Sequence, residues 1–203
     1  GIEKFVYIPN VVFSNLSKLT KRTYVNDGHQ YFVDGSPVVV TKGTDQILVA
    51  NTGVGGRAVF ALKVTDPSAF TGGNGGDVLW EYTNADLGYT MGQPRIGQLK
   101  NGEWVVVFGS GYNNTGTGYN SSSGVAYLFV VDLSTGALVK KIATNSSTSN
   151  GLTSPTLLSD PADGRIIAAY AGDALGNMWK FDLSASDPTN IPSTAMFSGA
   201  PLF

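Results

Sequence analysis

The sequence predicts an all-β fold made of repeated units of short strands. A small or polar residue followed by proline opens an apolar run four times, at Ser36-Pro37, Gln93-Pro94, Ser154-Pro155 and Ala200-Pro201. Between consecutive prolines the same order recurs: an apolar run, a Gly-rich turn, a second apolar run and an acidic turn. A period of about 40 to 60 residues built only from short strands is typical of the blades of a β-propeller.

The composition supports this fold class and excludes several functions. The 203 residues include 26 glycines and 9 prolines, and only 14% are charged, which is typical of many strands joined by turns. A net charge of −2 gives no electrostatic reason to bind nucleic acid or an anionic membrane. The absence of cysteine excludes thiol catalysis, disulfides and Cys-ligated zinc within these residues.

Residues 1–30 are expected to be the end of one blade. Residues 2–8 form the predicted strand, which ends at Pro9 and resembles the interior of a strand more than a natural start. Residues 14–22 form the predicted helix, capped by Ser14, with Leu16 and Leu19 on one face. We expect this helix to pack on the edge of the propeller.

Three blades follow, at residues 31–88, 89–150 and 151–198, and residues 199–203 start the next blade. The strands predicted in the first blade are Pro37–Val40, Gln46–Asn51, Ala58–Val64 and Val78–Tyr82. Those in the second are Pro94–Leu99, Trp104–Gly109, Ala126–Val131 and Ala137–Ile142. Those in the third are Pro155–Leu158, Ile166–Tyr170, Met178–Asp182 and a weak fourth near Ala195. Three blades and part of a fourth cannot close a ring, so we expect self-association or contact with other blades of a longer parent chain.

Alignment of the blades assigns roles to two sets of residues. Equivalent strand positions hold Phe60, Phe129 and Trp179, which we expect to fill the space between blades. The same strands end at Asp66, Asp132 and Asp182, which are expected to turn the chain through Asx-type hydrogen bonds.

Several longer segments occur in a fixed order along essentially the whole chain. They are Phe5–Leu16, His29–Pro37, Gly55–Leu62, Val64–Pro67, Asp86–Pro94, Asn101–Asn113 and Asn150–Pro155. Together they closely resemble the C-terminal propeller of the PilC/PilY family of type IV pilus biogenesis factors and tip adhesins. The resemblance implies a modified seven-bladed propeller within a larger exported protein at the cell surface, outer membrane or pilus tip of a Gram-negative bacterium.

We also expect a function in binding and scaffolding, without catalysis and without a cofactor. Expected roles are pilus assembly, control of retraction, and attachment to host cells or abiotic surfaces. Expected partners are pilins, minor pilins and the remaining blades of the parent chain. Two alternatives stay open: a fragment of a quinoprotein-like enzyme, or a generic propeller scaffold of outer-membrane assembly.

Some members of this family carry a calcium loop before the segment that matches Tyr170–Asp173. The corresponding stretch here is Ser159–Ile167, in which only Asp163 falls on a family ligand position. Calcium requires six to eight oxygen ligands, whereas Asp160 is out of register and Arg165 adds a positive charge. We therefore predict an ordinary hairpin turn and no metal site in this stretch.

No residue pattern in the sequence points to catalysis. The single histidine, His29, lies at a strand entry without a second histidine or a cysteine to form a catalytic pair or metal site. Loops on rigid β scaffolds often carry recognition, so a polar loop at 112–124 is the candidate partner-facing surface. Its candidate residues are Tyr112, Asn113, Asn114, Tyr119 and Asn120. A tolerated insertion without a partner is the alternative.

Overall fold

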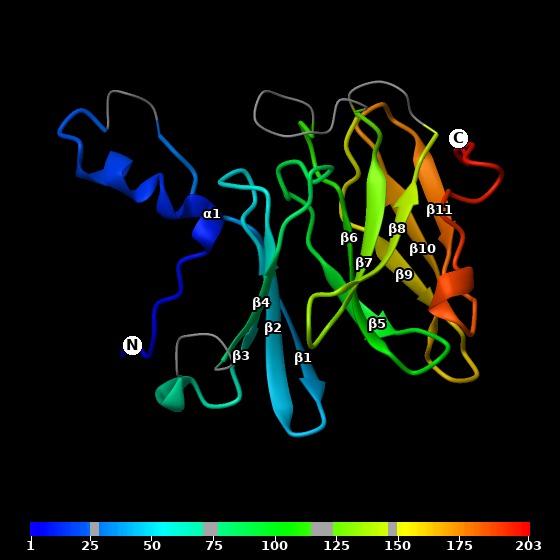
Figure 1. The fold of residues 1–203 in the computed structure, drawn as a ribbon, viewed down its shortest axis with the longest axis horizontal. Coiled ribbons are helices and arrows are strands. Elements are labelled where there is room, and N and C mark those ends of the chain that lie inside the picture. Colours follow the sequence, from blue (N-terminus) through cyan, green and yellow to red (C-terminus); the bar gives the residue numbers. More distant parts are fainter. Residues whose placement is uncertain (25–28, 71–76, 115–123, 146–149) are drawn as a thin grey trace.

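The computed structural model describes residues 1–24, 29–70, 77–114, 124–145 and 150–203. Within these residues the chain forms three antiparallel sheets that stand side by side (Figure 1). The first sheet contains β1 (Val38–Lys42), β2 (Asp45–Asn51), β3 (Val59–Lys63) and β4 (Val78–Tyr82). The second contains β5 (Arg95–Gln98), β6 (Trp104–Gly109), β7 (Tyr127–Asp132) and β8 (Leu138–Ala143). The third contains β9 (Thr156–Ser159), β10 (Ile166–Gly172) and β11 (Met178–Asp182).

Each sheet is a meander in which strands adjacent in sequence pair with each other. This is the strand order of propeller blades, and it confirms the predicted fold class. The predicted and observed strand boundaries differ by two residues or fewer, because proline and glycine mark both ends of the apolar runs. The sheets are called blades 1, 2 and 3 below.

The N-terminal segment differs from its prediction. Residues 2–8 form no strand, and Phe5 and Tyr7 instead lay their rings on blade 1. The Phe5 ring stacks 3.9 Å from that of Phe70, and the Tyr7 hydroxyl donates a hydrogen bond to Glu81. Side-chain contacts, and not the expected backbone pairing of a strand, therefore hold this segment on blade 1.

The predicted helix over 14–22 is also wrong. The segment forms a short α1 (Asn10–Phe13) and a 3-10 helix, η1 (Leu16–Thr20), and Ser14 caps the end of α1. Only Leu16 and Leu19 offer an apolar face, and Leu19 is 49% exposed, so little burial compensates the cost of forming a longer helix. Two further 3-10 turns are η2 (Pro67–Ala69) and η3 (Pro188–Asn190).

The weak fourth strand predicted near Ala195 does not form. The segment still lies beside β11 and β8, because Met196 N donates to Lys180 O at 2.8 Å and Ala195 N donates to Ala143 O at 2.8 Å. The last residues also lie along β11, where Leu202 N donates to Met178 O at 2.7 Å. The assignment of residues 199–203 to a following blade stays a prediction.

Large apolar side chains fill the spaces between the blades. Phe108 and Phe129 stack between blades 1 and 2, with ring centroids 5.5 Å apart, and the Trp80 indole donates to Leu133 O at 2.9 Å. Trp179 lies in the core between blades 2 and 3 and is 2% exposed. These positions confirm the predicted packing role of Phe129 and Trp179. Phe60 packs instead on the face of blade 1 that the N-terminal segment covers.

Backbone bridges join the blades at one end of the sheets. Two bridges join neighbouring blades: Gly53 pairs with Thr90, and Gly111 pairs with Leu152. Two more lie within a blade: Tyr89 pairs with Tyr112, and Leu152 pairs with Asp173. These bridges require close backbone approach. A Cβ atom on Gly109 would lie 2.4 Å from Leu152 O and 2.5 Å from Thr153 O.

The repeated prolines lie at the same end and take part in these contacts. The Gln93 side chain donates to Pro37 O at 3.0 Å, while Gln93 N donates to Ser154 Oγ at 2.7 Å. Arg95 Nε donates to Pro155 O at 3.1 Å. The proline segments that repeat in the sequence therefore form hydrogen bonds between successive blades.

Substitution of Gly109 by alanine should destabilise the chain by about 1–3 kcal/mol, because the added methyl group meets backbone oxygen atoms that cannot turn away. Gly172 is a matched control, since it also ends a strand but its Cβ would meet nothing closer than 3.8 Å. Urea denaturation should show a lower midpoint for Gly109→Ala and little change for Gly172→Ala. Equal midpoints for the two variants would contradict this account.

Candidate functional site

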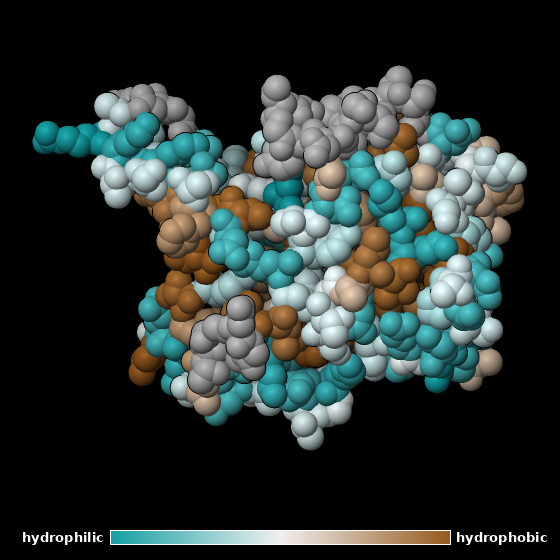
Figure 2. All heavy atoms as spheres, viewed as in Figure 1, coloured by the Kyte–Doolittle hydropathy of each residue, from teal (hydrophilic) through white to brown (hydrophobic). Residues whose placement is uncertain are grey.

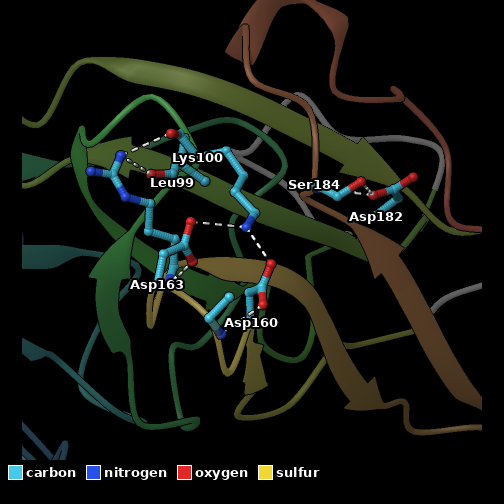
Figure 3. A network of polar contacts seen from close by, with 8 residues as sticks. Leu99, Lys100, Asp160, Asp163, Asp182 and Ser184 are labelled. Atoms are coloured by element: carbon cyan, nitrogen blue, oxygen red, sulfur yellow. Dashed lines mark hydrogen bonds and ion pairs between the residues drawn. The ribbon is translucent and has the colours of Figure 1, made fainter.

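The turn between β9 and β10 lies within the Ser159–Ile167 stretch, and the turn between β5 and β6 faces it (Figure 3). Asp160 and Asp163 lie in the first turn and Lys100 lies in the second. The Lys100 turn is a hairpin closed by Gly102, whose φ of 88° favours glycine. Two hairpins from neighbouring blades thus bring opposite charges together.

Lys100 binds both carboxylates. Its Nζ donates to Asp160 Oδ2 at 2.6 Å and to Asp163 Oδ2 at 3.0 Å. The other carboxylate oxygens accept backbone N–H groups of their own turn: Ala162 N to Asp160 and Arg165 N to Asp163, each at 2.9 Å. Both carboxylates are therefore oriented by their own hairpin and share one ammonium group from the neighbouring blade.

Arg165 also links the β9–β10 turn to the β5–β6 turn of blade 2. Its Nη1 donates to Lys100 O at 2.8 Å and to Leu99 O at 3.5 Å (Figure 3). The guanidinium lies against Gly102, where an added Cβ would be 3.0 Å from Nη1. The positive charge of Arg165 is thus held at the backbone of blade 2.

These contacts shift the pKa values of all three partners. The hydrogen bond from Lys100 lowers the pKa of Asp160, and the hydrogen bond from Arg165 N, followed by that from Lys100, lowers the pKa of Asp163. The hydrogen bonds to Asp160 and Asp163 raise the pKa of Lys100. The cluster is therefore held in its fully charged form around neutral pH.

The residues of this turn do not fit a calcium ion. Calcium requires six to eight oxygen ligands, and here the two carboxylates already bind an ammonium group, with a guanidinium beside them. Within the described ranges, no group of three or more His, Cys, Asp or Glu side chains is placed to hold a metal. The hairpin predicted from the sequence is present as an Asp160–Gly164 turn.

The acidic turns predicted from the repeat are confirmed. Asp66 accepts from Ser68 N, Asp132 accepts from Ser134 N and Thr135 N, and Asp182 accepts from Ser184 N and Oγ. Figure 3 also shows the hydrogen bond of the Asp182–Ser184 pair. These carboxylates act as turn formers, with their oxygens committed to backbone N–H groups.

Asp173 is the centre of a second polar network, at the bridged end of blade 3. Its Oδ1 accepts from Leu175 N and Asn177 N at 2.9 Å, so it closes the turn between β10 and β11. Its Oδ2 accepts from the side chains of Asn150, Asn177 and Trp179 at 2.7–2.8 Å, contacts for which the sequence offered no signal. Burial alone would raise the pKa of Asp173, but these hydrogen bonds lower it.

The candidate partner-facing loop is only partly described. Tyr112 is half-buried, Asn113 is exposed with a φ of 56°, and Asn114 is buried and donates to Val125 O at 2.7 Å. Tyr119 and Asn120 lie outside the described residues. Among the three described candidates, Asn113 is exposed, Tyr112 is partly exposed and Asn114 is buried. The recognition role of the loop stays a prediction.

The single histidine has an exposed, aromatic environment. The His29 ring contacts the Tyr31 ring edge to face, with centroids 4.8 Å apart.

Among the helices in the described part of the chain, none is long and apolar enough to cross a membrane.

The three neighbouring meanders, two of four strands and one of three, define the chain as part of a β-propeller. Comparison with known proteins identifies the family: residues 3–199 match the family model of the PilY1 beta-propeller domain. The chain therefore belongs to the PilY1 β-propeller family.

Named relatives agree with this assignment. The chain is 39% identical to the type IV pilus biogenesis factor PilY1 of Pseudomonas aeruginosa strain UCBPP-PA14, with 100% of this chain and 19% of the relative covered. It is 40% identical to a PilY1 homolog of Xylella fastidiosa strain Temecula1, with 93% and 13% covered. The chain thus spans less than a fifth of the length of these relatives.

A solved structure shows the same fold. The crystal structure of the Pseudomonas aeruginosa PilY1 C-terminal domain superposes with a TM-score of 0.74 at 34% sequence identity, covering 100% of this chain and 42% of that chain. The relatives are named as biogenesis factors and not as enzymes.

Replacement of Lys100 by methionine should lower stability most at neutral pH. The lowered pKa values of Asp160 and Asp163 mean that their contribution is present above their ordinary pKa of about 4 and is lost as the pH falls through the folded-state values. The difference in unfolding midpoint between Lys100→Met and the parent chain should therefore shrink below about pH 4.

Lys21→Met is the matched control, because it removes an exposed lysine that lies outside this cluster. It should leave the pH profile of unfolding unchanged. A Lys100→Met difference that is the same at pH 3 and pH 7 would show that the ammonium group is not the source of the effect.

Proposed function

We propose that this chain is part of the propeller of a type IV pilus biogenesis factor, exported to the cell surface or pilus tip. The observation that carries the proposal is the family match over residues 3–199, together with about 40% identity to named biogenesis factors. In this role the propeller acts in pilus assembly, in control of retraction and in attachment to host cells or abiotic surfaces. Its partners are pilins and minor pilins.

The proposed role is non-catalytic. A quinoprotein-like site would need acidic metal ligands and a stacking tryptophan that converge on a ring centre. Trp80 and Trp179 instead donate their indole N–H groups within the blade junctions, to Leu133 O and to Asp173. Their commitment to packing supports scaffolding and binding over catalysis.

The remaining blades of the parent chain are the proposed partner of the exposed blade faces. Phe60 and Leu62 of blade 1 are buried in a cluster with Phe5 and Tyr7 of the N-terminal segment. Figure 2 shows further apolar surface on the left side of the molecule. Ile2 and Val6 of the covering segment are 86% and 65% exposed. Apolar surface of this kind is typical of a contact with another element.

We also propose that the junction between blades 2 and 3 works without calcium. The ammonium group of Lys100 binds both carboxylates and so occupies the place that a cation would take between them. Addition of calcium or of a chelator should leave the unfolding midpoint of the parent chain unchanged, measured by thermal denaturation at constant ionic strength. A rise in midpoint on calcium addition that depends on Asp163 would contradict this proposal.

Deletion of residues 31–198 from the parent gene should greatly reduce the number of surface pili seen by electron microscopy and abolish twitching. Pili that return when retraction is also disabled would place the propeller in retraction control, whereas pili that stay absent would place it in assembly. The control is a full-length gene carrying Lys21→Met. Normal piliation and twitching after the deletion would refute the pilus role.

A further inference from the structure

Blade 3 lies at the opposite end of the row of blades from the N-terminal segment (Figure 1). One of its faces packs on blade 2, and its outer face corresponds to the one that blades 1 and 2 turn toward the next blade. In blades 1 and 2 the centre of this face is aliphatic and 0% exposed: Val49, Val59 and Ala61 in blade 1, and Val107, Leu128 and Val130 in blade 2. The outer face of blade 3 is built differently.

The strand register identifies the equivalent positions in blade 3. In each blade one residue donates its backbone N–H across the turn that follows the second strand: Thr52 in blade 1, Ser110 in blade 2 and Asp173 in blade 3. Three residues before it begins the cross-strand pair at the centre of the face: Val49–Ala61, Val107–Val130 and Tyr170–Lys180. Blade 3 thus has an aromatic ring and a cation where the other blades have aliphatic pairs.

The ammonium group of Lys180 is available to a partner. Its Nζ lies 5.7 Å from the centroid of the Tyr170 ring, and both residues are partly exposed. In the part of the chain that the structure describes, this ammonium group forms no ion pair with a carboxylate. Asp182 lies on the same face, but its Oδ1 accepts from Ser184 N and Oγ.

A blade that covers this face must supply a negative charge. Burial of an ammonium group without a counter-charge is strongly unfavourable, because the charge loses its hydration. An aliphatic face like those at the other two junctions therefore does not fit over Lys180. Leu158, which is 44% exposed, and Met178 lie on the same face, so the matching surface combines a carboxylate with apolar groups around it.

The backbone at the bridged end of blade 3 also differs from that of blades 1 and 2. Gly53 and Gly111 have φ values of 59° and 69° and bridge to Thr90 and Leu152 of the next blade. The equivalent residue of blade 3 is Ala174, which is exposed and whose φ is not positive. The bridging glycine thus has no counterpart among the described residues of blade 3, and side-chain contacts must carry more of any attachment there.

We propose that another blade of the parent chain docks on the outer face of blade 3 and places a carboxylate on Lys180. The choice of occupant rests on the continuity of this face with the two blade junctions, and on the length of the related protein, since the chain covers 42% of the PilY1 C-terminal domain. The inference rests on the proposed function only in taking the chain as part of a longer propeller. A junction closed by a charge pair weakens as salt is raised.

The test is zero-length cross-linking of the full-length parent protein with a carbodiimide, which joins a lysine amine to a carboxylate only where the two are in contact. Mass spectrometry of the digest should find Lys180 joined to an Asp or Glu outside residues 1–203 of the same molecule. Lys100 is the internal positive control, because its Nζ lies 2.6 Å from Asp160 and 3.0 Å from Asp163. Mixing isotope-labelled with unlabelled protein separates cross-links within one molecule from those between two.

Hydrogen exchange of the full-length protein gives an independent test. Lys180→Met should speed the exchange of the β11 amides about threefold or more at about 50 mM salt, and the difference should shrink at about 500 mM, where the parent junction is itself weakened. Lys180→Arg keeps the charge and should exchange as the parent does. Lys21→Met is the control for the loss of an exposed lysine elsewhere.

Three cross-linking results would overturn the proposal: Lys180 joined to a carboxylate within residues 1–203, such as Asp182, Lys180 joined to a second molecule, or Lys180 unjoined while Lys100 couples to its partners. Equal exchange in Lys180→Met and Lys180→Arg would also overturn it. None of these outcomes bears on piliation, which the deletion in the parent gene tests separately.

Discussion

The structure depends on close backbone contact between neighbouring blades at the entry of each inner strand. Gly111 pairs with Leu152, and Leu152 in turn pairs with Asp173, so one residue joins the end of blade 2 to blade 3. A side chain on Gly111 would lie 2.0 Å from Tyr89 O, so this contact excludes every other amino acid. The packing of aromatic rings between blades follows from this spacing.

The junction between blades 2 and 3 is tied at both ends. Backbone bridges join one end, the Lys100–carboxylate cluster joins the other, and Trp179 and its neighbours fill the core between them. Blades 1 and 2 follow the same plan, with Gly53 paired to Thr90 at one end and Lys42 Nζ donating to Ser134 Oγ at 2.5 Å at the other. Contacts at both ends of each junction hold neighbouring blades in a fixed relative position. The blades can therefore act as a scaffold that presents the loops.

Sequence reasoning succeeded where the constraint is local. Strand limits such as Val78–Tyr82 follow from the alternation of apolar runs with glycine and proline, and Asp182 forms its turn with the very next residues. It failed for residues 2–8 and 14–22, whose conformations depend on what they contact. The rings of Phe5 and Phe70 meet across 65 positions, and no periodicity in the sequence reports such a pair.

The candidate sites divide in the same way. Residue type and spacing alone predict the blade repeat and the turn-forming aspartates, because both depend on residues that are close together along the chain. The mismatch of Ser159–Ile167 with a calcium loop is a prediction of the same kind. The pairing of Lys100 with Asp160 and Asp163 could be found only in the folded chain, because these residues are about 60 positions apart in the sequence. Electrostatic contacts act through space over a few ångströms, and folding alone brings distant charges to that range.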